Sequence, residues 1–350
     1  MKKIVYSIFL LVAVLAFVSC GGGKKGNDQK EKQLNLYIWS AYVSDETLAK
    51  FEKDTGIRVR YDTYDSNEAL LEKMQSGVAD YDVIVPSDYM VRIMLHQNLL
   101  EKIDLNRLPN FKNLGKRFQN LQYDPNNAHS LPFLWGTTGI GYDKTKVKET
   151  VDSWGILWNP KYKDRILMLD DLREVFGAAL KWKGHSINTT NEAELQEAKN
   201  LLMQQKPLVK TYSSSNFDEI LLSGDVWLAH GWSGQLAKAA DQNKNLTYIV
   251  PKEGSTLWID NLAIPASAKH KEEAYVFLNF FLDPAVAAEV TNYSGYPSPN
   301  EAAKPFIKPH ILNDPARYPS EDVLAKCELL MDLGATTQLL DRMWTEIKSR

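Results

Sequence analysis

Apolar residues along the first hundred positions after residue 33 alternate between the period of a strand and that of a helix. Ser44 is a typical N-cap before the first predicted helix, and Gly56 is a typical residue to end it. The predicted elements of this part are strands at 34–39, 57–61 and 83–85 and helices at 44–55, 67–77 and 89–97. Regular strand–helix alternation is typical of an α/β domain with a largely parallel sheet.

A looser alternation continues to the carboxyl terminus, with no internal repeat of about 20–50 residues. Gly139, Gly141 and the stretch 260–266 are candidates for crossings between two lobes. The predicted elements of this part are strands at 165–169, 226–229, 248–251 and 262–265 and helices at 172–181, 191–205, 271–281, 284–292 and 335–348. At about 150 residues per domain, a chain of 350 residues favours two such units.

The amino terminus has the pattern of a targeting segment. A short basic start is followed by an almost wholly apolar run at 4–18, which is shorter than the ~20 residues of a membrane span. This pattern predicts a signal peptide over residues 1–19. Phe17 to Cys20 resembles a bacterial lipobox, with Phe17 in place of the usual Leu, which implies lipid on Cys20; the alternative is a plain signal peptide. The glycines and polar residues of 20–33 indicate a flexible tether.

Composition excludes several function classes. The formal net charge is −3, whereas a nucleic-acid-binding surface normally shows a basic excess. Two cysteines, Cys20 and Cys327, cannot build a disulfide framework or a cysteine zinc site, and the six histidines are scattered. No P-loop, HExxH or GxGxxG pattern occurs. We therefore expect no cofactor and no metal, and we expect a structural role for Cys327.

Two patterns raise the question of catalysis. Gly231 to Gln235 approaches a nucleophile elbow, but neighbours on a strand point to opposite faces, so His230 and Ser233 do not form a dyad by adjacency. Asp171 and Glu174 are three residues apart near a strand-to-helix turn. They could be an acidic first turn that favours the helix dipole, fixed charges for a cation, or a glycosidase acid/base pair.

Aromatic residues stand at predicted strand ends and turns, beside small polar or acidic residues. In open α/β sheets ligands bind beyond the carboxyl ends of strands, so rings at these positions would contact a ligand. An ammonium group over an aromatic face gains about 0.5–2 kcal/mol, and a nearby carboxylate adds to this. The groups are Trp39-Ser40-Ala41-Tyr42, Ser87-Asp88-Tyr89, Gly231-Trp232-Ser233, Trp258-Ile259-Asp260 and Gly295-Tyr296-Pro297. The pattern favours a linear aliphatic ligand that carries amines.

Six segments, in order along the chain from about residue 34 to the end, resemble those of the bacterial periplasmic spermidine/putrescine-binding proteins. The segments are 36–43, 81–87, 131–136, 171–176, 251–260 and 295–300. The resemblance implies two mainly parallel α/β lobes that close on a ligand cleft, 34–137 plus 261–305 as lobe 1 and 138–260 plus 306–350 as lobe 2. It also implies a non-enzymatic role in capturing a polyamine for an ATP-driven (ABC) permease.

The resemblance also implies a ligand-binding set. Asp260 would bind an amine deep in the cleft, and Trp258 would stack on the chain. Asp171 and Glu174 would hold the amine nearer the other lobe, and Trp39 and Trp232 would clamp the methylenes. The complete set is Trp39, Tyr42, Ser87, Tyr89, Asp171, Glu174, Ser214, Trp232, Trp258, Asp260 and Tyr296, with Ser40 and Asp88 as additional candidates.

Two departures affect the expected ligand. Ala41 stands where the family commonly has an acid, and Leu330 stands where the spermidine binder has a polar amide, so both remove polar contacts to an amine. The expected protein is a monomer on the periplasmic face of the envelope, or on the outer face of the cytoplasmic membrane where no outer membrane exists. It would contact the membrane only through the lipid. The alternatives are another cationic solute such as a thiamine-like one, a glycan-processing enzyme, or a ligand sensor for a signalling receptor.

Overall fold

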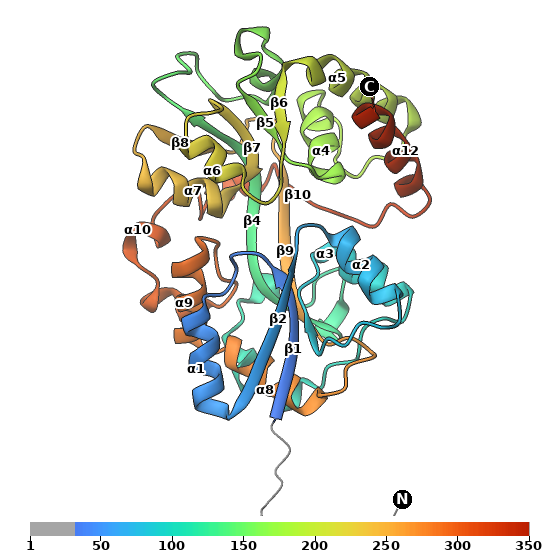
Figure 1. The fold of residues 1–350 in the computed structure, drawn as a ribbon, viewed down its shortest axis with the longest axis vertical. Coiled ribbons are helices and arrows are strands. Elements are labelled where there is room, and N and C mark those ends of the chain that lie inside the picture. Colours follow the sequence, from blue (N-terminus) through green and yellow to red (C-terminus); the bar gives the residue numbers. More distant parts are fainter. Residues whose placement is uncertain (1–31, 350) are drawn as a thin grey trace, which may run out of the picture. The chain divides into compact units, whose positions relative to one another are not determined.

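A ten-stranded mixed sheet runs through the computed structural model, which describes residues 32–349 (Figure 1). The strand order is β2-β1-β3-β9-β4-β7-β5-β6, with β10 beside β9 and β8 beside β4. The strands are β1 (Lys32–Trp39), β2 (Ile57–Tyr64), β3 (Val83–Ile84), β4 (Ser130–Asp143), β5 (Ile166–Met168), β6 (Val209–Tyr212), β7 (Leu228–Trp232), β8 (Leu246–Ile249), β9 (Thr256–Ala263) and β10 (Glu328–Leu329). The predicted α/β fold class is confirmed.

Strand β4 connects the two halves of this sheet. It pairs antiparallel with β9 up to Thr137 and with β7 from Thr138 onward. Among residues 32–349, five of the nine strand pairings are parallel, and the four antiparallel ones all involve β4 or β9. The outer strands are therefore parallel, as expected, and the two strands that carry the chain between the halves are antiparallel.

Helices cover both halves (Figure 1). Helices α1–α3, α8 and α9 pack on the β1–β3 half, whereas α4–α7 and α12 pack around β5, β7 and β8. They are α1 (Asp45–Thr55), α2 (Asn67–Gln75), α3 (Asp88–His96), α4 (Leu172–Trp182), α5 (Glu192–Gln205), α6 (Phe217–Leu222), α7 (Ser233–Gln242), α8 (Lys271–Phe281), α9 (Pro284–Ser294), α10 (Pro309–Leu312), α11 (Glu321–Leu324) and α12 (Thr336–Ser349). None of these is by itself long and apolar enough to cross a membrane, and only α8 and α9 together, across a 77° bend, have the required length and composition.

Local sequence explains the elements that were predicted. Ser44 is the N-cap of α1 and its Oγ accepts a hydrogen bond from the Thr47 backbone at 3.2 Å, while Gly56 takes the left-handed conformation that ends the helix. Strand β4 was missed because its first twelve residues are all buried, so they show no polar alternation. Helices α6 and α7 and strand β6 were also missed, and α7 opens with residues that form no apolar stripe.

The amino-terminal predictions fall mainly outside the described residues. The signal peptide and Cys20 lie there, and so does most of the tether at 20–33. Lys32 and Gln33 already belong to β1, so the strand begins two residues before its expected start. Cys327 is half-buried just after α11 and its Sγ lies 3.5 Å from the Val323 carbonyl.

A buried carboxylate joins three segments of the β1–β3 half. Asp82 is 0% exposed. It accepts hydrogen bonds from the backbone of Asn35 at 2.9 Å and from the backbone of Lys269 and His270 at 3.0 and 2.8 Å. The His270 Nδ1 lies 2.9 Å from the same carboxylate. Asp82, which directly precedes β3, is therefore hydrogen-bonded both to β1 and to the loop after β9.

We expect Asp82→Ala to lower the free energy of unfolding by about 3 kcal/mol, because several donors lose a buried charged acceptor. The matched control is Asp80→Ala, since Asp80 is half exposed and forms a surface ion pair with Lys269 at 3.2 Å. That change should cost less than about 1 kcal/mol. Urea unfolding of both variants measures the difference, and equal losses would contradict the structural role of Asp82.

Candidate binding site

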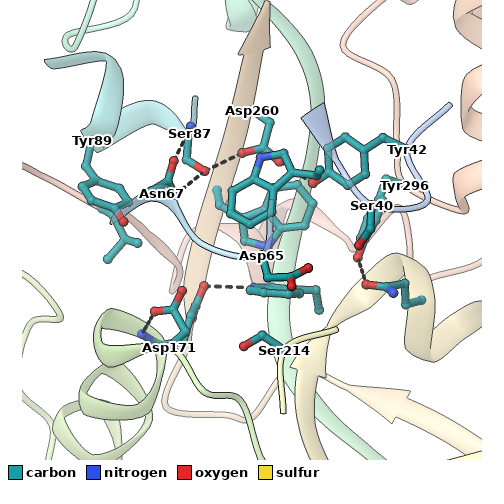
Figure 2. A pocket seen from close by; sticks show the side chains of 16 residues that line it. Ser40, Tyr42, Asp65, Asn67, Ser87, Tyr89, Asp171, Ser214, Asp260 and Tyr296 are labelled. Carbon is teal, nitrogen blue, oxygen red and sulfur yellow. Dashed lines mark hydrogen bonds between the residues drawn. The ribbon is translucent and has the colours of Figure 1, made fainter. Parts of the chain in front are cut away.

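The eleven expected site residues and Ser40 line one pocket, whose space between atoms, open solvent at its mouth included, is about 580 Å³ (Figure 2). They come from the carboxyl ends of β1, β3, β5, β6 and β7, from β9, and from the loop after α9. Four further residues complete the lining: Asp65, Asn67, Gln235 and Leu330. Within each half the strands that end at the pocket are parallel, and three antiparallel pairings (β3–β9, β9–β4 and β4–β7) reverse the strand direction between the halves. The carboxyl ends of the two halves therefore point toward the same pocket, where residues far apart in sequence meet.

Asp260 is the most buried carboxylate of the pocket, at 3% exposure. Tyr42 donates its hydroxyl to one carboxylate oxygen, and the Ser87 hydroxyl donates to the other at 2.5 Å. Burial raises the pKa of Asp260 to about 6, and the two hydroxyl donors act in the opposite direction. The empty site therefore holds a carboxylate that water does not fully stabilise.

Ser87 is positioned by Asn67, a lining residue that the sequence did not point to. The Ser87 backbone donates to the Asn67 Oδ1 at 3.1 Å, and the Asn67 Nδ2 donates to the Ser87 Oγ at 3.0 Å. Because Ser87 makes no side-chain cap of its own helix, its hydroxyl is free to reach Asp260. Figure 2 shows this chain of contacts from Asn67 through Ser87 to Asp260.

Aromatic rings form the walls. The Trp39 indole donates to the Val85 carbonyl at 2.9 Å, and its ring centroid lies 6.3 Å from that of Trp232 in an edge-on arrangement. The Tyr296 ring lies 5.1 Å from that of Trp258 and 5.5 Å from that of Tyr42. Glycines permit these positions: a Cβ on Gly136 would lie 2.4 Å from the Trp258 ring and one on Gly234 2.3 Å from the Tyr296 ring.

Asp171 and Glu174 meet at the amino terminus of α4. The Asp171 side chain caps the helix by accepting from the Glu174 backbone at 3.1 Å. Both Glu174 oxygens accept hydrogen bonds, from the Trp232 indole at 3.3 Å and from the Thr256 hydroxyl at 2.9 Å. Burial and the neighbouring Glu174 raise the pKa of Asp171 to about 6, and burial raises that of Glu174.

A buried guanidinium stands behind these two acids. Arg173 is 4% exposed and donates to the Met331 carbonyl at 2.9 Å and to the Asn188 Oδ1 at 3.1 Å. It also lies over the Tyr89 ring, 5.4 Å from the centroid. Arg173 is not part of the lining, and no Lys, Arg or His is. The surface that a ligand would contact is acidic and aromatic.

Asp88, expected as an additional candidate, is not among the residues that line the pocket. Its side chain is 0% exposed, and its Oδ1 accepts from the Tyr89 backbone at 2.7 Å, while its Oδ2 has no partner among the described residues. Burial raises the pKa of Asp88 well above the ordinary value for an aspartate. The first residue of α3 turns its carboxylate back onto its own helix, so it supplies no charge to the lining.

Of the two residues that depart from the family pattern, Leu330 lines the pocket and Ala41 does not. Ala41 takes a left-handed conformation with φ of 59° and an exposed side chain, and it does not line the pocket. Leu330 does line it and is 6% exposed. Leu330 therefore places an apolar side chain in the lining, whereas Ala41 is not part of it.

The arrangement gives no support for hydrolase chemistry at Ser233. His230 is 0% exposed with both ring nitrogens unpartnered among the described residues, and burial lowers its pKa to about 3. The Ser233 Oγ accepts instead from the Thr137 backbone at 3.3 Å. Across residues 32–349, no group of three or more His, Cys, Asp or Glu is arranged to hold a metal ion.

The sequence did not identify Asp65 and Gln235 as lining residues, because the end of β2 was placed too early and α7 was not predicted. The sequence pattern ended the second strand at residue 61, but β2 continues to Tyr64, so Asp65 stands at its carboxyl end. The rule that ligands bind at strand ends would have found Asp65 had the strand been extended. Gln235 lies in the first turn of the unpredicted α7, where its Oε1 accepts from the Tyr296 hydroxyl at 2.8 Å.

Comparison with known proteins gives consistent similarity along the chain. The profile of the bacterial extracellular solute-binding proteins matches residues 46–319. A spermidine/putrescine-binding periplasmic protein of Salmonella typhimurium is 39% identical over 318 residues, 90% of this chain and 91% of that protein.

Two solved structures extend the comparison. A lipoprotein of Treponema pallidum superposes with a TM-score of 0.83 at 32% identity, covering 91% of this chain and 100% of that one. A spermidine/putrescine ABC transporter substrate-binding protein of Streptococcus pneumoniae gives a TM-score of 0.79 at 34% identity, covering 91% and 99%. The similarity includes both halves of the sheet.

The raised pKa of Asp260 predicts how pH affects the empty protein. The Asp260 carboxyl has a pKa of about 6 in the folded state and of about 4 in the unfolded chain. The folded state therefore binds the proton more tightly, so the contribution of Asp260 to stability is present at low pH and is lost as pH rises from about 4 to about 6. Asp260→Asn removes the titration. Relative to the wild type, the variant should gain about 3 kcal/mol between pH 4 and pH 7. Urea unfolding across this range measures it, and parallel curves would contradict the buried state of Asp260.

Proposed function

This chain belongs to the bacterial extracellular solute-binding proteins, and we propose that it captures a polyamine of the spermidine or putrescine class. The observation that carries the proposal is the pocket lining, which combines four carboxylates and six aromatic side chains with no basic residue. Protonated amines pair with carboxylates and lie over aromatic faces, while the methylenes between them contact the rings. The names of the relatives in Salmonella and Streptococcus support the same ligand class.

The site residues take the following roles in this proposal. Asp260 binds an ammonium in the deepest part of the pocket, with Tyr42 and Ser87 keeping its carboxylate oriented. Asp171 and Glu174 bind a second ammonium. Trp39, Trp232, Trp258 and Tyr296 enclose the aliphatic chain; Tyr89, Ser40 and Ser214 complete the wall.

We propose that the ligand is held between two lobes, 34–137 plus 261–305 and 138–260 plus 306–350, and that their closure presents it to an ABC permease. The change of partner of β4 between Thr137 and Thr138 supports the first boundary, whereas the boundary at 260/261 lies within β9. The Streptococcus relative, named for an ABC transporter, supports the permease partner. No catalytic step is proposed for Asp171 and Glu174, since both Glu174 oxygens accept hydrogen bonds from the protein.

Calorimetry with spermidine and putrescine tests the ligand class, using protein that has been unfolded and refolded to remove bound amine. Asp260→Asn should weaken binding by about 100-fold and Asp171→Asn by about tenfold, because Asp260 is the more buried and Glu174 remains beside the second site. The control is Asp62→Asn, which changes an acid of β2 outside the pocket.

Equal losses of affinity in Asp260→Asn and Asp171→Asn would overturn the ranking of the two sites. Binding of thiamine but neither polyamine would replace the ligand class.

We further propose that Cys20 carries the lipid that attaches the protein to the envelope, as the lipobox-like sequence and the Treponema lipoprotein suggest. In cells given labelled palmitate, the wild type should be labelled and found with membranes, whereas Cys20→Ser should lose the label and become soluble. Cys327→Ser is the matched control and should behave as the wild type. A Cys20→Ser protein that stays with membranes and keeps the label would disprove the anchor.

A further inference from the structure

Asp65 differs from the other three carboxylates of the pocket in having no protein partner. Both oxygens of Asp260 and both of Glu174 accept hydrogen bonds, and Asp171 caps α4. The carboxylate of Asp65 takes part in no hydrogen bond or ion pair with any residue of 32–349. Its acceptor positions are all available to a ligand.

The backbone around Asp65 is nevertheless fixed. The preceding residue, Tyr64, is buried and donates its hydroxyl to the Val85 carbonyl at 2.5 Å. The N-cap of α2 follows at Ser66, and Asn67 is held by two hydrogen bonds to Ser87. Asp65 is thus the single residue between Tyr64, the last residue of β2, and Ser66, the N-cap of α2, and hydrogen bonds fix the chain on both sides of it. This placement holds its carboxylate at the pocket without a side-chain contact.

The opposite wall provides a matching acceptor. Ser214 follows β6, lines the same pocket, and has a buried Oγ with no partner in the described part of the chain. Strands β2 and β6 are the two outermost strands in the sheet order, so the two edges of the sheet supply Asp65 and Ser214. In Figure 2 Asp65 lies in the pocket between Asp260 and Ser214. An ammonium has three donors, which suits a carboxylate together with a hydroxyl.

The charges of the pocket favour a ligand with three ammonium groups. Its lining holds four carboxylates and no Lys, Arg or His. Asp171 and Glu174 meet at the start of α4, so the four carboxylates form three groups: Asp260, the pair Asp171 and Glu174, and Asp65. Asp65 is exposed, so it stands at the open side of the pocket; a linear diamine would occupy two of the three groups and leave the third without an ammonium, whereas a linear triamine would pair all three.

We propose that Asp65 and Ser214 form a third ammonium site and that Asp65 makes the pocket select linear triamines over diamines. This inference rests on the proposed polyamine function. It adds a specificity-determining residue, directly after β2, to the two acid sites already described.

Calorimetry at pH 7.5 with the chain from Cys20 to Arg350 tests the proposal, using spermidine as the triamine, putrescine as the diamine and 1,8-diaminooctane as a dication matched to spermidine in chain length. We expect the wild type to bind spermidine at least about tenfold more tightly than either diamine. Asp65→Asn should reduce the affinity for spermidine by about tenfold and change that for the diamines by less than about threefold. Ser214→Ala should act in the same direction with a smaller effect.

Two controls separate the outcomes. Asp65→Glu keeps the charge and should retain the preference, and Asp62→Asn removes a carboxylate of β2 outside the pocket and should change nothing. Equal loss of all three ligands in Asp65→Asn, or an unchanged spermidine preference, would overturn the third site while leaving the polyamine function intact. Failure of the wild type to bind any of the three amines would instead overturn the proposed function itself.

Discussion

The antiparallel pairing of β4 with β9 is the constraint on which the rest of the structure depends. β4 continues from this pairing into the second half of the sheet, and β9 passes through the centre of the pocket. Trp258 and Asp260 are two residues apart on β9, so they point to the same face. Trp258 lies opposite Gly136, whose missing side chain leaves space for the indole. One strand pair therefore joins the halves and places Asp260 and Trp258 in the lining of the pocket.

Electrostatics in the empty pocket follow from that placement. Burial raises the pKa of Asp260 and of Asp171 to about 6, and the neighbouring Glu174 adds to the rise at Asp171, while the hydrogen bonds that both carboxylates accept act in the opposite direction. A cationic ligand would remove this cost by pairing with the ionised carboxylates. A neutral molecule of the same shape would not remove it.

The sequence predicted a strand where its buried and exposed residues form a distinct pattern, and missed a strand that is buried throughout. The alternating elements around β1, β2 and β3 were located closely, because each has a distinct apolar pattern and a capped helix such as the one that begins after Ser44. Strand β4 was missed because burial on both faces removes the alternation on which the prediction relies. All eleven expected site residues line one pocket, including Ser214 after the missed strand β6, because the resemblance implies them residue by residue and not through the predicted elements.

The sequence by itself determined the chemical character of the site, because the residue types at strand ends fix which charges and rings can meet a ligand. Only the tertiary structure decided which acids line the pocket. Asp65 enters because β2 extends three residues further than its pattern indicates, and Asp88 is excluded because its side chain bonds to its own helix end. Both outcomes depend on the direction of a side chain relative to packed neighbours. That direction is set by contacts between segments distant in the chain, which no local pattern records.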